Sequence, residues 1–288
     1  MKRYLTFFLA LFVLFSLVAC GEPEPTGTKK PQSEKPGTTQ STGPVAMKTI
    51  YVITGSSTTH IVDGTITYEY KQFFSYDDQG RMIRYTFEVD GNSMDSVKME
   101  IQCDEYGRTA QIRSIQDGKE VTVTYAYDEM GNRLSQITAQ DGNTLQSQHY
   151  TYDADGNLLS RELEVSGISE RVEYVYEQGR LVKEISYHDG ELSQYELYYY
   201  DDQGRVTKSE TRLSNDALYF TWDYTYSEDG LTTYSTCEKY KLSTVTVRDE
   251  HGNVIRTENI DVGGKSVTEY TFLAIEIPAD TPRKNDVV

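Results

Sequence analysis

Apolar and polar residues alternate along most of this chain with the two-residue period of a β-strand. Residues 121–127 place Val, Val, Tyr and Tyr on one face and Thr, Thr and Ala on the other, and residues 83–89 alternate in the same way. The alternation starts at Lys48 and continues to Ile275 without a convincing 3.6-residue period. We therefore expect seventeen to nineteen strands and essentially no helix in this part of the chain.

A short turn motif, variants of Tyr-Asp-x-x-Gly, separates many of these strands. Its glycines recur every 22 to 27 residues, which is typical of a repeat architecture. An Asp at the first turn position accepts hydrogen bonds from backbone N–H groups, and a Gly at the last position adopts positive φ and closes a type I turn with a bulge. The copies occupy residues 76–80, 103–107, 127–131, 152–156, 176–179, 200–204, 226–230 and 248–252.

A second turn class, Asp-Gly or Gly-Gly, falls between the first, and it is the strongest short-range signal for a β-hairpin. Each period therefore contains two strands and two turns. We expect an all-β fold, a single curled or spiralling antiparallel β-meander, because an open sheet of this width does not stay flat. Its edges, at residues 49–52 and 267–272, would be free to pair with another chain. The second turns are at residues 63–64, 90–91, 117–118, 141–142, 189–190 and 263–264.

Aromatic residues recur two positions before the turn in six of the eight copies, so they share a face with the turn tyrosines. Curling is expected to place this face inside, with the intervening strands filling the gaps between the rings. The six residues are Phe74, Tyr125, Tyr150, Tyr174, Tyr198 and Tyr224.

The repeated turn resembles that of the RHS/YD-repeat family, which is named after the Tyr-Asp dipeptide. The family pattern continues Gly-Arg-Leu, as at residues 179–181, and Arg or Asn follows the turn glycine in seven of the eight copies, Leu231 being the exception. The resemblance covers residues 64 to 275 and implies a spiralling antiparallel sheet. Large members form shells around toxins or act in adhesion. This chain is short and has no recognisable self-cleavage or toxin segment, so we do not carry shell function over.

The N-terminus has the features of a bacterial export signal. Lys2 and Arg3 precede an apolar run from Leu5 to Val18, which is short for a transmembrane helix. Residues 17–20, Leu-Val-Ala-Cys, resemble the lipoprotein cleavage box. This resemblance implies a signal peptide of residues 1–19 and acylation of Cys20, which would attach the protein to a lipid bilayer. An ordinary signal peptide with an incidental cysteine is the alternative.

The rest of the chain divides by composition. Residues 20–47 are rich in Gly, Pro, Thr, Ser, Lys and Glu and predict a disordered tether after the lipidated cysteine. Residues 48–278 form the predicted repeat domain, and residues 279–288 form a tail. The formal net charge of −17 argues against binding to nucleic acid and indicates a solvated surface.

The candidate chemistry is sparse. Cys103 and Cys237 are five repeats apart, so we do not expect a disulfide, and Cys103 takes a place that is Tyr in most copies, as a buried filler. Residues 153–164 partly resemble a calcium-binding loop but lack its glycine and its flanking helices, and turn chemistry explains their acids. The four histidines share no metal-ligand spacing. We predict no catalytic residue, no metal and no cofactor.

Aromatic side chains remain as candidates for ligand contact, by stacking on sugars or gripping peptides. We single out Trp222, Tyr224, Tyr198 and Tyr174, although core packing also explains them. The sequence thus predicts a lipid-anchored extracytoplasmic protein of the bacterial cell envelope, with a non-enzymatic role in binding, adhesion or scaffolding and an unknown protein or glycan partner. The alternatives are recognition of glycan or peptidoglycan by exposed tyrosines, and a relative of RHS toxin systems.

Overall fold

The computed structural model describes residues 47–279, apart from residues 79, 94–96 and 117. The predicted signal peptide, Cys20 and nearly all of the predicted tether and tail lie outside the described residues. The described chain is all-β, apart from one 3₁₀ turn at Glu238–Tyr240, so the expected strand number and the near absence of helix are confirmed. The strands are β1 (Met47–Val62), β2 (Thr65–Tyr76), β3 (Met82–Val89), β4 (Asn92–Ser93), β5 (Val97–Cys103), β6 (Thr109–Gln116), β7 (Lys119–Tyr127), β8 (Arg133–Gln140), β9 (Asn143–Tyr152), β10 (Leu158–Val165), β11 (Ile168–Glu177), β12 (Arg180–His188), β13 (Glu191–Tyr200), β14 (Val206–Leu213), β15 (Leu218–Tyr226), β16 (Thr232–Cys237), β17 (Leu242–Arg248), β18 (Val254–Asp261) and β19 (Gly264–Pro278).

The two turn classes form as their residues predict. In the β7–β8 turn the Gly131 N–H donates to the Asp128 carbonyl over 3.1 Å and Gly131 has a φ of 84°. The pairing also shifts register here, between Ala126 and Tyr127, as a bulge requires. In the β8–β9 turn Asp141 and Gly142 both have positive φ, as a two-residue type I′ hairpin demands. The short copy at residues 176–179 has become a turn of this second kind.

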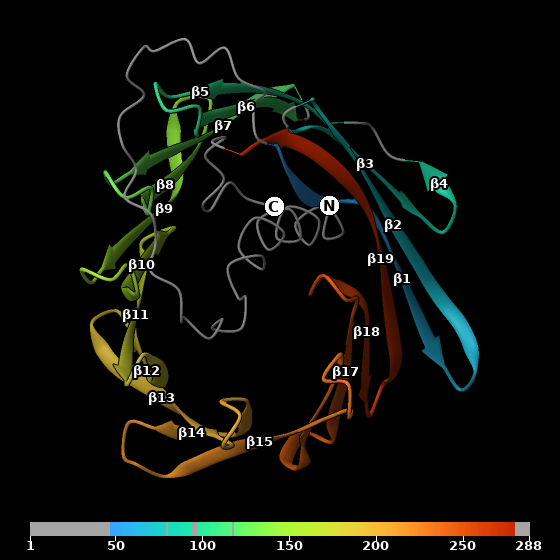
Figure 1. The fold of residues 1–288 in the computed structure, drawn as a ribbon, viewed down its shortest axis with the longest axis vertical. Helices are drawn as coiled ribbons and strands as arrows, with labels where there is room; N and C mark the ends of the chain where they lie inside the picture. Colours follow the sequence, from blue (N-terminus) through green and yellow to red (C-terminus); the bar gives the residue numbers. More distant parts are fainter. Residues whose placement is uncertain (1–46, 79, 94–96, 117, 280–288) are drawn as a thin grey trace.

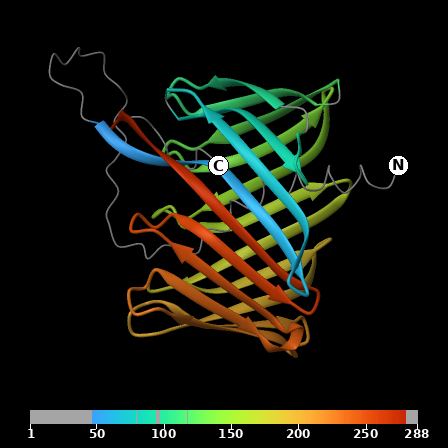
Figure 2. The same ribbon diagram turned by 90° about the vertical axis from the view of Figure 1, so that its right-hand side faces the viewer.

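The sheet closes into a barrel, which corrects the expectation of an open sheet with two free edges. All strands except the two-residue β4 form an 18-membered antiparallel ring, because β19 pairs with β1 from Met47↔Pro278 to Ile61↔Lys265. Figure 1 shows the ring, and Figure 2 shows β1 and β19 running side by side. The predicted edges, residues 49–52 and 267–272, therefore both pair in the β1–β19 seam. Twist and repeated bulges accumulate curvature until the edges meet, and pairing satisfies their N–H and C=O groups.

The aromatic face lines the inside of this barrel. Side chains on a concave face converge, and the most buried residues of the wall fall mainly on the face that carries the turn tyrosines. On β7, for example, Val123 and Tyr125 are buried, while Thr124 and Ala126 on the other face are exposed. The expected orientation of the aromatic face is thus confirmed.

The strands between the aromatic ones fill the gaps with smaller polar side chains. Ser209 on β14 stands opposite Tyr198 on β13 and Trp222 on β15, and it is fully buried. Gln136 on β8 stands opposite Tyr125 and is 4% exposed. Alternating large rings with small polar residues packs the inner wall without steric conflict.

Cys103 and Cys237 are both free thiols. Cys237 is buried, whereas Cys103 is half-buried and its Sγ lies 2.7 Å from Nη1 of Arg81. Cys103 thus occupies the place of a turn tyrosine but is less enclosed than a filler. Nowhere in the described ranges is there a helix with the length and apolarity needed to cross a bilayer.

Candidate functional site

Five of the turn tyrosines donate a hydrogen bond to a backbone carbonyl that lies about 20 residues earlier in the chain. The hydroxyl of Tyr127 donates to the carbonyl oxygen of Thr109 over 2.9 Å, and Tyr152 donates to Arg133 over the same distance. Burial raises the pKa of Tyr152 to about 12, so the phenol stays a donor at any physiological pH. Corresponding bonds run from Tyr76 to Ile53, from Tyr200 to Leu181 and from Tyr226 to Val206.

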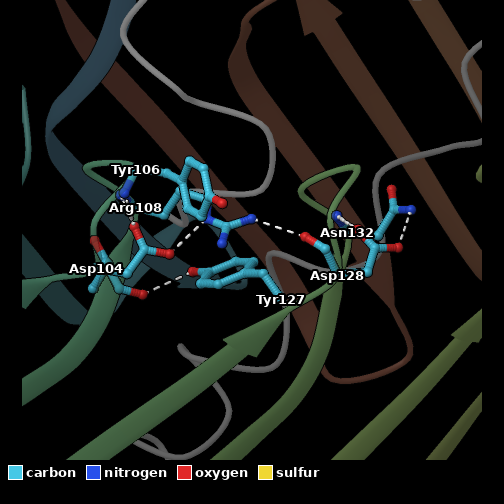
Figure 3. Close-up of polar contacts among 7 residues, drawn as sticks. Asp104, Tyr106, Arg108, Tyr127, Asp128 and Asn132 are labelled. Carbon is cyan, nitrogen blue, oxygen red and sulfur yellow. Dashed lines mark hydrogen bonds and ion pairs between the residues drawn. The ribbon is translucent and has the colours of Figure 1, made fainter. Parts of the chain in front are cut away.

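The residue after the turn glycine completes this connection, as Figure 3 shows for two successive turns. Nε of Arg108 lies 2.7 Å from Oδ2 of Asp104 in its own turn, and its Nη1 donates to the carbonyl of Asp128 in the next turn. The Arg108 guanidinium also lies 4.7 Å from the ring centroid of Tyr127. We call these contacts the rim ladder; they involve the turn Asp, the Arg or Asn after the turn glycine, and the turn Tyr. They join successive turns to each other and therefore have a structural role.

The aspartates of the rim ladder accept hydrogen bonds from donors within their own turns. Asp153 accepts from the backbone N–H groups of Asp155 and Asn157 and from the Asn157 side chain, at 2.7 to 2.9 Å. Although desolvation acts to raise it, these hydrogen bonds lower the pKa of Asp153 below its ordinary value. Both carboxylate oxygens of Asp153, the first ligand that the calcium alternative requires, are thus engaged in the turn.

The predicted ligand-contact residues come together on the inner wall of strands β11 to β15. Tyr174, Tyr198, Trp222 and Tyr224 are all half-buried and all on the inner face. They are therefore placed as a group by the fold, inside the barrel and not on its outer surface.

Two carboxylates, which the sequence analysis missed, lie within this group. Glu184 on β12 stands directly opposite Glu196 on β13, and Tyr174 stands opposite Glu184 from the other side. The Tyr198 hydroxyl donates to Oε1 of Glu184 over 2.9 Å, and Glu196 lies two residues before Tyr198 on the same face of β13. We refer to Tyr174, Glu184, Glu196, Tyr198 and Trp222 as the inner-wall cluster.

The electrostatics of the cluster follow from having two acids and one donor. Burial raises the pKa of Glu184, and the charge of Glu196 raises it further, against the opposing effects of the Tyr198 hydrogen bond and of Arg161. Burial and the two carboxylates raise the pKa of Tyr198 far above its usual range. A hydroxyl has a single proton to donate, so one carboxylate always lacks a full share of it.

Glu184→Gln is expected to stabilise the barrel at pH 7 and not at pH 4. A carboxyl whose pKa is raised in the folded state destabilises that state once it is ionised, so its contribution becomes unfavourable as pH rises above the ordinary value of 4.5. Gln keeps an oxygen that accepts from Tyr198. Urea unfolding should show a gain of the order of 1 kcal/mol at pH 7 and none at pH 4.

The matched control is Glu170→Gln, which removes another inner-wall carboxylate, one that stands opposite His188 and not opposite an acid. It should not show the same pH-dependent gain. Equal behaviour of the two variants, or a Glu184→Gln gain that persists at pH 4, would contradict the proposed repulsion.

Comparisons with known proteins do not connect this chain to a protein of known function. A family model described as an uncharacterised protein matches residues 104–207, and no curated protein matches. A porin-like protein from Bacteroides uniformis is 12% identical with a TM-score of 0.42, over 77% of this chain and 98% of that one. TcdB2-TccC3-TEV, whose crystal structure is known, is 12% identical with a TM-score of 0.29, over 79% of this chain and 16% of that one. Likenesses with TM-scores this low carry no inference about function, and the RHS/YD-repeat likeness remains one of motif.

Proposed function

We propose that this protein is a bacterial lipoprotein that is held on the extracytoplasmic side of a membrane by acylated Cys20 and acts by binding, without catalysis, in the cell envelope. The apolar run and the Leu-Val-Ala-Cys box at residues 17–20 support the anchor. The first strand begins at Met47, which leaves the intervening segment as the link between the anchor and the barrel. The closed barrel is the binding element.

The observation that carries the binding role is the separation of charge between the two faces of the wall. On strands β17 to β19 and β1 the inner face bears mainly hydroxyls and amides, while the outer face bears ion pairs such as Arg256–Glu258, 2.7 Å apart. Such a lining suits a polar ligand. The inner residues in question are Thr244, Thr246, Thr257, Asn259, Ser266, Thr268, Ser56 and Thr58.

Unsatisfied polar atoms on the same face support a polar occupant. Gln72 is 6% exposed, and its Nε2 has no hydrogen-bond partner in the described part of the chain. Ser209 is fully buried, and its Oγ is likewise unpartnered there. Buried donors and acceptors without partners are costly, so a polar guest or water that reaches this face gains hydrogen bonds.

The inner-wall cluster favours glycan recognition. The alternative, scaffolding by pairing of sheet edges with another chain, has less support. The seam uses both edges, so among the described strands no long edge remains for pairing with another chain. Trp222, Tyr224, Tyr198 and Tyr174 instead offer aromatic faces beside hydroxyl and carboxylate groups, the combination that recognises sugar rings. Envelope glycans are the ligands within reach of a protein anchored in this way.

The anchor is tested by replacing Cys20 with Ala. Fatty-acid labelling and membrane retention should both be lost, and the protein should appear in the soluble extracytoplasmic fraction. A variant that stays on the membrane would contradict the lipid anchor.

The binding role is tested on an array of envelope glycans with Trp222→Ala. This variant should lose the glycans that the unchanged protein retains, whereas Tyr234→Ala, on the outer face of β16 and 44% exposed, should keep them. Equal loss in both variants, or retention in both, would contradict binding at the inner wall.

A further inference from the structure

The inner-wall cluster contains an arrangement that selects among glycans. Glu184 and Glu196 face each other across β12 and β13 on the inner wall, where the surrounding strands carry mainly neutral residues. No lysine or arginine of the described residues lies within 4.0 Å of either carboxylate. Arg161, on the inner face of β10, acts on Glu184 only through space. The pair therefore lacks its own counter-ion.

A serine hydroxyl near the acid pair also lacks a hydrogen-bond partner among the described residues. Ser209 lies on the same inner face, opposite Tyr198 on one side and Trp222 on the other. Its hydroxyl is fully buried and has no partner among the described residues. The site thus offers two carboxylate acceptors and a hydroxyl whose hydrogen-bonding capacity is unused.

The aromatic members set the size of the ligand. Tyr174 on β11 is directly opposite Glu184, while Trp222 on β15 is two strands beyond Glu196. Strands in a sheet are about 4.8 Å apart, so the span from Glu196 to Trp222 is about 10 Å. A ligand that contacts both the acid pair and Trp222 is longer than one sugar ring.

We propose that the inner-wall cluster binds an oligosaccharide of amino sugars with free ammonium groups, an ammonium being held between Glu184 and Glu196 and a neighbouring ring stacking on Trp222. This inference rests on the proposed glycan-binding function and adds the ligand class. An ammonium supplies three donors and the missing positive charge, and it lies favourably next to the faces of Tyr and Trp. An N-acetylated sugar supplies neither the charge nor the additional donors.

The test is calorimetric titration of the full chain with a β-1,4-linked glucosamine tetramer, its fully N-acetylated counterpart and spermidine. The glucosamine tetramer should bind at least about ten-fold more tightly than the acetylated tetramer, because one charge-assisted contact of this kind is worth about a factor of ten. Spermidine should bind more weakly than the glucosamine tetramer, since it has no ring to stack.

Variants identify the groups responsible. The double variant Glu184→Gln with Glu196→Gln should bind the two tetramers equally, and Glu170→Gln should keep the preference for the amine. Trp222→Ala should weaken both tetramers and leave spermidine unchanged. Far-UV circular dichroism and denaturant midpoints confirm that each variant is folded before it is titrated.

The outcomes separate this inference from the proposed function. Equal binding of both tetramers by the unchanged protein, with loss of both in Trp222→Ala, overturns the amine preference and leaves glycan binding in place. Spermidine binding as tightly as the glucosamine tetramer overturns the saccharide. Binding of neither tetramer overturns the inference outright, whatever the glycan array shows.

Discussion

Thr58→Pro is expected to open the barrel and to destabilise it by about 3 kcal/mol or more. Thr58 lies in the C-terminal half of β1 and is paired on both sides, with Thr268 of β19 and with Tyr70 of β2. Proline removes a backbone donor from this ladder, and its ring does not fit the centre of a sheet. The measurements are the midpoint and slope of urea unfolding, together with the sedimentation behaviour of the variant.

Opening of the barrel should also cause the variant chains to associate with one another. Once β1 and β19 separate, each presents a long row of unpaired N–H and C=O groups, which templates pairing between chains. Thr58→Pro should therefore form oligomers at concentrations at which the unchanged protein does not.

The control is Ala154→Pro, at the second position of the turn between β9 and β10. Type I turns favour proline at this position, and Ala154 is exposed. Its unfolding midpoint should stay close to that of the unchanged protein or rise slightly. If Thr58→Pro proved as stable and as monomeric as Ala154→Pro, the pairing of β1 with both β19 and β2 would be contradicted.

Asp128→Ala is expected to cost about 2 to 3 kcal/mol, because it removes a carboxylate that accepts from two buried donors. Oδ1 of Asp128 accepts from the backbone N–H of Asn132, and Oδ2 accepts from the Asn132 side chain, both at 2.7 Å. Asn132 is 1% exposed, so water does not replace the lost bonds. Thermal and urea unfolding measure the loss.

Asp202→Ala provides the comparison for this substitution. Asp202 follows the first residue of the equivalent turn between β13 and β14 and is exposed. It should change stability by less than about 0.5 kcal/mol, as surface substitutions usually do. A similar loss in both variants would show that the turn aspartates act through general charge and not through their hydrogen bonds.

Local chemistry made most of this fold predictable. The Asp and Gly of each turn act within a few residues, and the alternation of Val and Tyr with Thr acts within one strand, so both can be read from the sequence. The side on which Trp222 and Tyr198 lie followed from the same alternation. The acylation of Cys20 concerns residues outside those described and stays a prediction.

Closure of the barrel was not predictable by this route. Thr58 and Thr268 meet across the seam although 210 residues separate them in sequence. Whether two edges meet depends on the twist summed over every strand, and small differences at each bulge decide between a spiral and a ring. No local sequence motif determines this total twist.

The acid pair was missed for a related reason. Glu184 and Glu196 become partners only when the register between β12 and β13 is known, and that register contains a shift between Ser186 and Tyr187. A one-residue error would have placed one of the acids on the outer face. Two glutamates in neighbouring strands of an acidic protein give no signal by themselves.

A disulfide across the seam tests closure most directly. The hydroxyl oxygens of Thr58 and Thr268 are 2.9 Å apart, so the double variant Thr58→Cys with Thr268→Cys should cross-link within one chain under mild oxidation. Thr257, one strand further on and opposite Thr268, provides the control, because Thr58→Cys with Thr257→Cys is too widely spaced to bridge. A closed barrel predicts a disulfide within the monomer between the cysteines introduced at positions 58 and 268, mapped by mass spectrometry, and none in the control pair. Free thiols in both pairs, or only cross-links between chains, would contradict a closed barrel.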